Sequence, residues 1–566
     1  MEFSLQNGFA LTVSDDRIDV RGGGYRLFSF PVSTPCDAYL PNCSVAEDVD
    51  TGLTFLGARE TDGCTALAWT AESSLYRKKE YTVRICDTYF TYRVRLFGSA
   101  ELERVRFFGG GGGTKYFVSG YFDCQADYHT EQTAHYLVGH ERALQPYLFS
   151  PPPYVVPFWN EFNDKIVSVG IADRPGCNNY FRFTPSYEKP QKMWFDVPYY
   201  GHDAVRGEWT SPTVRVSFGD DEWREIERYC RWAEKEFGYP VRNGKETPPW
   251  WKKPIFCGWN EQYNLRQAKR ASGEFADTKS LSTQKNYTEM LARIDRVGLR
   301  PGTVVIDDMW QTDYGRNEVD TAKWRDLRAF ADEQHRKDRR VLLWWRLWSP
   351  DGLPGDECIV SDGCAVAADP TSPVYQKRIA QIVRTLLSDG PGCMNCDGFK
   401  LDYIYRLPPL GDRAKPHDPT VYGLELLRIY YKTIYDEAKK VKPDALIDTS
   451  IAHPYFADVF DVIRLHDYSA IQRSTVSMME FRAKTVRCAF PGALIDTDGA
   501  NSYTGDAQEV LFHNRRACRV GIPALYALSN LSDADLEEIQ REWERYEQAD
   551  KSEFRISGIG SRGSCL

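Results

Sequence analysis

The sequence predicts a multi-domain protein in which an N-terminal antiparallel β-sandwich is followed by a (β/α)8 TIM barrel. Residues 1–245 consist largely of short alternating segments interrupted by Gly, Pro and Asp, which is the pattern of antiparallel strands. After PPWWKKP, Pro248 to Pro254, short apolar segments alternate with amphipathic helical patterns. A chain of 566 residues also exceeds the size of one ordinary core. We therefore expect a β-sandwich domain over 1–245, a barrel over 246–546 and a loose tail over 547–566.

The N-terminal part contains segments rich in Val, Thr, Tyr and Phe, such as EYTVRICDTYFTYRVRLF, Glu80 to Phe97. Many such runs with few helical patterns are typical of a large antiparallel sandwich. The glycine run Gly109–Gly113 lacks the spacing of a phosphate-binding loop, because Thr114 stands where the last glycine should be. We therefore expect a turn there, or a loop that approaches another domain.

Eight apolar strand-like segments follow the boundary, with helix-like or loop segments between them. They are IFCGW from Ile255, TVVIDD from Thr303, VLLWWRLW from Val341, FKLDYIY from Phe399, ALIDTS from Ala445, VIRLHD from Val462, ALIDTD from Ala493 and IPALYAL from Ile522. One intervening helix is PVYQKRIAQIVRTLL, in which Ile379, Ile382, Val383 and Leu386 fall on one face. Eight strand–helix units of this length imply a (β/α)8 barrel.

Composition and charge exclude several classes of function. The net charge of −9 argues against a nucleic-acid partner, which needs a basic face. No apolar run approaches the ~20 residues of a membrane span, and MEFSLQNGFALTVSDD lacks the pattern of a signal peptide. The 15 cysteines are scattered, so we expect reduced thiols in a cytoplasmic protein. Cys393 and Cys396 form a single CxxC without a second pair at zinc-ribbon spacing, so we expect no metal site and no cofactor.

The predicted strands end in polar residues, at the end of a barrel where active sites lie. These residues are Asp307, Asp308, Arg346, Asp402, Asp448, Asp467, Asp496 and Asp498. A single aspartate there can simply cap the following helix. So many at corresponding places favour a functional site. The high aromatic content of 14% fits either core filling or flat platforms for a ligand.

Alternation along two strands predicts which side chains enter the barrel. On the third strand Leu342, Trp344, Arg346 and Trp348 share the inward face. An arginine between two tryptophans is either a stacked structural residue or a group that binds an anionic or hydroxyl-rich ligand.

On the fourth strand, in GFKLDYIYRL, the alternation points Lys400 and Asp402 inward and Phe399, Leu401 and Tyr403 outward. Charges on a buried strand are usually paired or used in function. We expect Lys400 to lower the pKa of Asp402, as a nucleophilic carboxylate requires.

Several motifs, in their order along the chain, resemble glycoside hydrolase family 36 and its clan relatives, families 27 and 31. VVIDDMWQ and TAKWRDLRAFADEQHRKDRRVLLW are similar to the Asp-Asp-x-Trp motif, helix and tryptophan-ending strand of those families. AVAADPTSPVYQKRIAQIVRTLL and GFKLDY resemble the Asp-x-x-x-Pro helix and the Lys-x-Asp nucleophile strand, and LHDYSAIQRSTV resembles the segment that holds the acid/base. The resemblance covers residues 255–540 and implies a retaining α-glycosidase with Asp402 as nucleophile and Asp467 as general acid/base.

The resemblance also implies substrate contacts typical of an α-galactosidase. Asp307 and Asp308 would bind sugar hydroxyls, Trp259 and Trp344 would wall the pocket, and Lys400 would reach a neighbouring hydroxyl.

One departure from the family bears on the sugar. Family 36 members follow the strand-three tryptophan with Glu-Pro-Glu, whereas this chain has WWRLWSP. Arg346, together with Arg464, would favour a sugar that bears a carboxylate or sulfonate.

Two other readings stay open from the sequence. In an enolase-type barrel, Asp402, Asp448 and Asp467 would be magnesium ligands and Lys400 a base. In a transglycosylase or sugar-binding relative, the same pocket would serve without net hydrolysis. In either glycoside reading the partner is a carbohydrate, and a homo-oligomer is compatible with the sequence.

Overall fold

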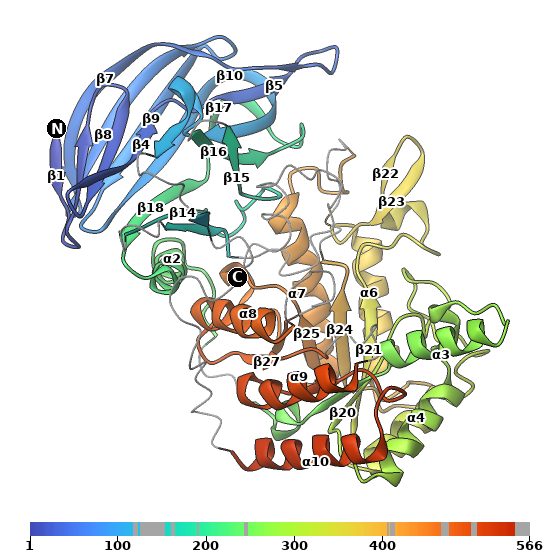
Figure 1. Ribbon diagram of the computed structural model, residues 1–566. Helices are drawn as coiled ribbons and strands as arrows, with labels where there is room; N and C mark the ends of the chain where they lie inside the picture. The colour runs from blue at the N-terminus through green and yellow to red at the C-terminus, as the bar shows by residue number, and fades with distance from the viewer. Residues whose placement is uncertain are drawn as a thin grey trace.

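The computed structural model describes residues 1–116, 123–124, 153–159, 165–188, 192–242, 247–404, 407, 414–465, 475–499 and 506–549. Two units follow one another along the chain, a β-rich unit and a barrel (Figure 1). The predicted boundary at residue 245 and residues 550–566 of the tail predicted over 547–566 lie outside the described residues, and the first residues of that tail end the last helix, α10 (Asp533–Gln548). The predicted fold class, a β-rich domain followed by a TIM barrel, is confirmed.

The β-rich unit is a hydrogen-bonded set of antiparallel strands. The strands are β1 (Glu2–Ser4), β2 (Phe9–Val13), β3 (Arg17–Gly22), β4 (Tyr25–Pro31), β5 (Cys36–Tyr39), β6 (Val45–Ala46), β7 (Asp50–Thr61), β8 (Cys64–Ser73), β9 (Lys78–Ile85), β10 (Tyr89–Phe107), β11 (Thr114–Tyr116), β12 (Asp123–Cys124), β13 (Val155–Trp159), β14 (Ile166–Ala172), β15 (Thr184–Glu188), β16 (Lys192–Pro198), β17 (Ala204–Thr210) and β18 (Thr213–Gly219). The long strand β10 pairs with β9 and β18 in its first half and with β5 and β16 in its second. Alternating burial along β2 and β9 places one face of each strand in the core.

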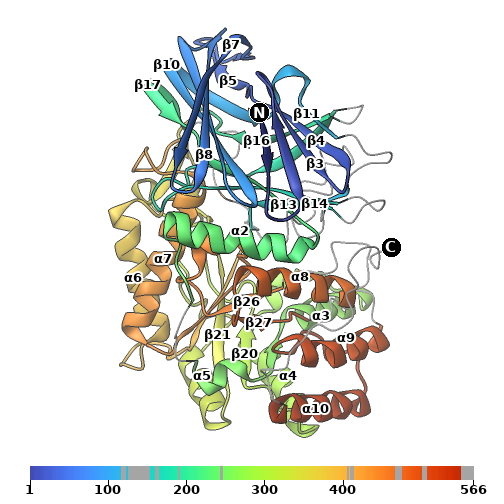
Figure 2. The ribbon, with the colours of Figure 1, turned by 90° about the vertical axis from the view of Figure 1, so that its left-hand side faces the viewer.

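The helix α2 (Glu222–Phe237) lies between the β-rich unit and the barrel (Figure 2). It begins at the cap Asp221, whose carboxylate accepts from two backbone N–H groups, and ends at Gly238 in the left-handed conformation. Its contacts reach β13, β14 and β18 on one side and α8 (Thr475–Ala489) on the other. The few helical patterns of the N-terminal part therefore include one helix that joins the two units.

The barrel contains all eight predicted strands, in parallel and in chain order around the sheet. They are β19 (Ile255–Cys257), β20 (Thr303–Ile306), β21 (Arg340–Arg346), β24 (Gly398–Asp402), β25 (Leu446–Thr449), β26 (Val462–Arg464), β27 (Leu494–Asp496) and β28 (Ala524–Leu525). A parallel bridge between Asp496 and Ile522 closes the ring between β27 and β28. Around it lie α8 and the helices α3 (Trp259–Ala271), α4 (Gln284–Arg296), α5 (Leu327–Arg336), α6 (Pro373–Leu387), α7 (Gly423–Val441), α9 (Ala507–Val520) and α10 (Asp533–Gln548).

Burial separates the two faces of the barrel strands. Leu342 belongs to the small apolar cluster inside the barrel, whereas Leu343 and Trp345 pack in the larger core beneath the helices. Phe399 and Leu401 also belong to that outer core, and Lys400 is buried on the other face. The predicted alternation of β21 and β24 is therefore confirmed within the strands themselves.

The alternation fails just beyond the strand ends. Trp348 has a φ of 67° and packs edge-on against Tyr430 of α7, so it does not share the inward face with Trp344. Tyr403 has a φ of 62° and its ring contacts Trp344 at 5.8 Å, so it lies on the inward side rather than outward. Each correction has the same cause: a left-handed residue ends the strand and breaks the two-residue period.

The glycine run forms a turn, the first of the two expected alternatives. The turn Gly110–Gly112 (η1) packs on Ser33 of the same β-rich unit, where a Cβ on Gly110 would lie 2.3 Å from the Ser33 Cβ. The strands β22 (Cys358–Ser361) and β23 (Cys364–Ala368) form an unpredicted hairpin between β21 and α6.

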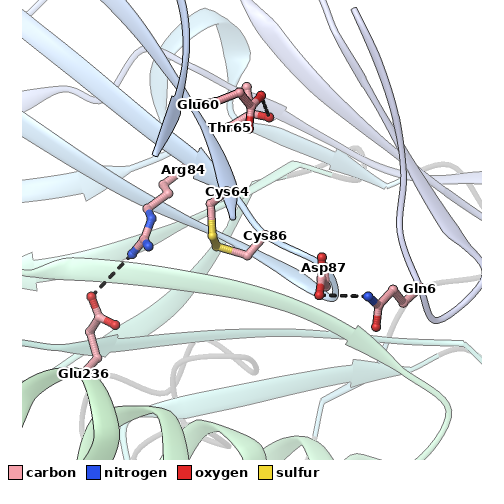
Figure 3. The surroundings of a disulfide bond; sticks show 8 residues. All are labelled: Gln6, Glu60, Cys64, Thr65, Arg84, Cys86, Asp87 and Glu236. Carbon is pink, nitrogen blue, oxygen red and sulfur yellow. Dashed lines mark hydrogen bonds and ion pairs between the residues drawn. A yellow bond between two sulfur atoms is a disulfide. The ribbon is translucent and has the colours of Figure 1, made fainter. Parts of the chain in front are cut away.

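Not all cysteines are free thiols. Cys64 and Cys86 form a disulfide at the adjoining ends of β8 and β9, with Cα atoms 4.5 Å apart (Figure 3). The register pairs Thr65 with Ile85, so the two cysteines are the next facing pair. The expectation of reduced thiols is wrong at this pair. Among the described residues, no helix is long and apolar enough to cross a membrane.

Candidate active site

Asp402 lies at the carboxyl end of β24, where the barrel opens. Its Oδ2 accepts a hydrogen bond from Trp344 Nε1 at 3.0 Å, and its Oδ1 accepts one from the Tyr403 backbone N–H at 2.8 Å. Arg464 Nη2 lies 3.6 Å from Oδ1. These donors fix the orientation of the carboxylate and stabilise its negative charge. Its side chain is 16% exposed, so an oxygen can still be reached from the barrel mouth.

The start of β24 explains how this strand seats the carboxylate. Gly398 has a φ of 151°, and a Cβ there would lie 2.0 Å from the carbonyl oxygen of Leu446 on β25. Only glycine permits this close approach of the two strands.

Lys400 forms an ion pair with Asp307, the residue directly after β20. The distance between Lys400 Nζ and Asp307 Oδ2 is 2.7 Å. The same Asp307 oxygen accepts from Cys257 Sγ at 3.1 Å. Burial alone lowers the pKa of Lys400, but the charge of Asp307 outweighs it, so the pKa is raised and the ammonium stays charged. From the sequence we expected Lys400 to act on Asp402. The ion pair that the structure describes for Lys400 is with Asp307 instead. Among the described residues, Arg464 is a cation that lies beside Asp402.

Arg464 is surrounded by carboxylates at the bottom of the site. Besides Asp402, its guanidinium lies 3.8 Å from Asp448 Oδ2 and 3.3 Å from Asp498 Oδ2, and the residue is 1% exposed. A guanidinium with three carboxylate neighbours and no exposure is poorly placed to bind a substrate anion. This geometry lets Arg464 position the neighbouring carboxyl groups, and the substrate contact predicted for it from the sequence stays a prediction.

Two buried acids near Arg464 have raised pKa values. Burial, with the charge of Asp496 adding to it, raises the pKa of Asp448 well above its usual range. Burial and the charge of Asp498 raise the pKa of Asp496 to about 7. Such shifts are expected where several carboxylates share one desolvated site.

Asp308 lies next to a group of aromatic side chains at the end of β20. Its Oδ1 accepts from Tyr314 Oη at 2.6 Å, and burial raises its pKa to about 6 despite this bond. The Tyr314 ring lies 5.8 Å from that of Trp344. The Arg346 guanidinium lies 4.6 Å from the Tyr314 ring centre and 4.4 Å from that of Tyr403, which sandwiches it between two rings.

The structure therefore brings most predicted site residues to one end of the barrel. Trp344 is 2% exposed, so it supports Asp402 more than it walls a pocket. Trp259 is half-buried at the start of α3, directly after β19. Asp467, the predicted acid/base, lies outside the described residues.

Tyr314, Tyr403 and Cys257 also belong to this site, although the sequence did not single them out. Tyr314 lies in a loop, and nothing in its spacing indicates that it reaches Asp308.

The magnesium reading of the strand ends does not fit the described side chains. Arg464 lies within 3.6 Å of Asp402 and 3.8 Å of Asp448, where a shared metal ion would have to bind. Among the described residues no group of three or more His, Cys, Asp or Glu side chains is arranged to hold a metal.

Comparison with known proteins identifies the fold but no closer kinship. No protein-family model matches the chain, and no curated protein does either. A GH31 family sulfoquinovosidase from E. rectale matches in structure with a TM-score of 0.54 at 12% identity, covering 95% of this chain and 82% of that one. The GH36 α-galactosidase AgaA from Geobacillus stearothermophilus gives 0.52 at 10%, covering 99% and 87%. The α-galactosidase from Lactobacillus brevis gives 0.51 at 9%, covering 96% and 83%. The chain thus has the fold of α-glycosidases of families GH31 and GH36.

Proposed function

We propose that the protein is a retaining α-glycosidase that hydrolyses terminal α-linked hexosides, with Asp402 as nucleophile. The observation that carries this proposal is the setting of Asp402, which is oriented by Trp344 and the Tyr403 N–H, lies 3.6 Å from Arg464, and is reachable at the barrel mouth. The fold shared with GH31 and GH36 enzymes supports it. Among sugars, α-galactosides are favoured by the motif resemblance.

The reaction follows from two carboxyl groups. Asp402 attacks the anomeric carbon, while the acid form of Asp467 gives its proton to the leaving oxygen, so the glycosidic bond breaks and a glycosyl ester forms. The ionised Asp467 then takes a proton from water, whose oxygen attacks the same carbon and releases Asp402. The anomeric configuration is retained, and no metal or cofactor is consumed. If an acceptor sugar replaces the water, the same steps give transfer.

Asp307 and Asp308 fit the role of sugar contacts only in part. Both aspartates are buried, and Asp307 already forms an ion pair with Lys400. The two aspartates would therefore present one fixed polar surface to a sugar hydroxyl group. Asp308 keeps its Oδ2 without a described partner and is the more available acceptor.

The test follows aryl α-glycosides by proton NMR with wild type, Asp402→Asn and the control Asp338→Asn. Asp338 is an exposed aspartate at the opposite end of β21. We expect wild type and the control to release the α-anomer first, and Asp402→Asn to lose roughly 10³-fold or more in rate. Release of the β-anomer, or full activity of Asp402→Asn, would remove the proposed mechanism. Unchanged rates with a chelator are also expected.

A further inference from the structure

Two cations of the site, Arg346 and Lys279, lie over aromatic rings. Arg346 is sandwiched between Tyr314 and Tyr403, and Lys279 Nζ lies 5.3 Å from the Tyr314 ring centre. Both side chains are half-buried. Within the described part of the chain, neither has a hydrogen bond or an ion pair to a carboxylate. Ring contacts stabilise them by only about 0.5–2 kcal/mol each.

The other cations at this end of the barrel are arranged differently. Lys400 has Asp307 as its partner, and Arg464 has three carboxylates. Half-buried charge is costly unless it is paired. Asp308, the carboxyl group bonded to Tyr314, interacts electrostatically with both cations, so one acid faces two positive charges. Arg346 and Lys279 therefore leave an excess of positive charge beside Tyr314 that a ligand anion would neutralise.

The position of Arg346 connects this charge to the reacting centre. Arg346 on β21 is the direct register partner of Asp402 on β24. Tyr314, which contacts both cations, also donates to Asp308. A molecule whose anionic group meets Arg346 is thus within reach of both Asp402 and Asp308.

We propose that Arg346, assisted by Lys279, selects glycosides that carry a carboxylate, sulfonate or sulfate group. The inference rests on the proposed glycosidase function and specifies its substrate class. The guanidinium presents parallel N–H donors that match two oxygens of such a group. The rings of Tyr314 and Tyr403 hold the plane of the Arg346 guanidinium, so its N–H donors are oriented before the substrate binds. Lys279 adds a second, point-like charge.

The experiment compares matched substrates that differ in one group. Aryl α-hexosides with a neutral C6 hydroxymethyl are measured beside their C6 carboxylate and C6 sulfonate counterparts, in both the galacto and the gluco configuration. The readout is the ratio of kcat/KM for the anionic substrate to that for the neutral one. The variants are Arg346→Gln, Arg346→Lys, Lys279→Gln and Arg340→Gln, the last at the far end of β21 as control.

We expect wild type to prefer one anionic substrate. Arg346→Gln should lower the ratio by roughly 10- to 100-fold, as loss of a charge-assisted pair predicts. Arg346→Lys should lower this kcat/KM ratio less, because the positive charge is kept while the paired N–H donors of the guanidinium are lost. Lys279→Gln should lower the ratio by a few-fold. Arg340→Gln should leave it unchanged. The two anionic arms distinguish a planar carboxylate from a tetrahedral sulfonate.

Binding separates failure of this inference from failure of the proposed function. Calorimetry with free hexuronates, 6-sulfonates and neutral hexoses needs no turnover. Hydrolysis of neutral glycosides with no anionic preference and no effect of Arg346→Gln on the ratio would overturn the inference alone. If no glycoside is cleaved, the proposed function fails, and the inference stands only if an anionic sugar binds wild type and not Arg346→Gln.

Discussion

At the scale of single residues, the cations of the site divide into two kinds. Lys400 and Arg464 are buried and matched to carboxylates, so they organise the acidic groups around them. Arg346 and Lys279 contact aromatic rings instead. The same type of side chain can therefore serve as a positioning group or as a ligand contact, and the difference lies in which neighbours the fold supplies.

The raised pKa of Asp308 makes the free energy of unfolding decrease as pH rises. Burial raises its folded pKa from 3.8 to about 6, so the folded state binds a proton more tightly than the unfolded state. The stabilisation that protonated Asp308 provides is complete below about pH 4 and is lost as pH rises through 6. Asp308→Asn cannot ionise, so it should gain stability relative to wild type over that range, by at most about 3 kcal/mol.

Thermal or urea unfolding of both proteins at several values between pH 4 and pH 7 measures this change. The comparison uses differences between variant and wild type, so other titrating groups cancel. A difference that stays constant across the range would show that Asp308 is ionised normally.

At the scale of elements, the fit between β24 and β25 depends on Gly398. Because a Cβ would lie 2.0 Å from the Leu446 oxygen, Gly398→Ala must separate the two strands or shift β24. We expect a loss of about 3 kcal/mol in unfolding free energy and lower activity through displacement of Asp402. Gly355→Ala is the matched control, since a Cβ there meets nothing within 4 Å. Equal melting temperatures for the two variants would contradict the argument.

Elements of the barrel were predictable because buried parallel strands are continuous apolar runs, and all eight were found from them. The inward direction of Lys400 and Asp402 also follows from alternation. Their partners do not, because alternation fixes a face and says nothing about which residue of a neighbouring strand lies opposite. Thus Lys400 meets Asp307 and Arg464 meets Asp402. Tyr403 escaped prediction because its left-handed backbone reverses the direction that alternation gives.

At the scale of the whole molecule, the β-rich unit is joined to the barrel by specific polar contacts as well as by α2. The Asn178 backbone N–H donates to Glu425 of α7 at 2.8 Å, and Arg242 donates to the carbonyl of Phe460 at 2.9 Å. The first of these bonds anchors the N-terminal unit to α7, the helix that follows the strand carrying Asp402, and the second anchors it to the segment before β26.

The Cys64–Cys86 disulfide bears on where the protein works and how stable its β-rich unit is. Structural disulfides are typical of oxidising compartments, whereas the cytoplasmic location was expected from reduced thiols, so the redox state of this pair bears on that prediction. The bond spans a sequence separation of 22, for which loop entropy predicts about 3 kcal/mol of stabilisation.

We expect Cys64→Ser with Cys86→Ser to lower the melting temperature of the β-rich unit by several degrees. Cys43→Ser, at an exposed free thiol, is the control. Peptide mapping without reductant should recover the two cysteines in one linked fragment. Their recovery as separate free thiols, with no loss of stability in the double variant, would contradict the bond and favour the cytoplasmic prediction.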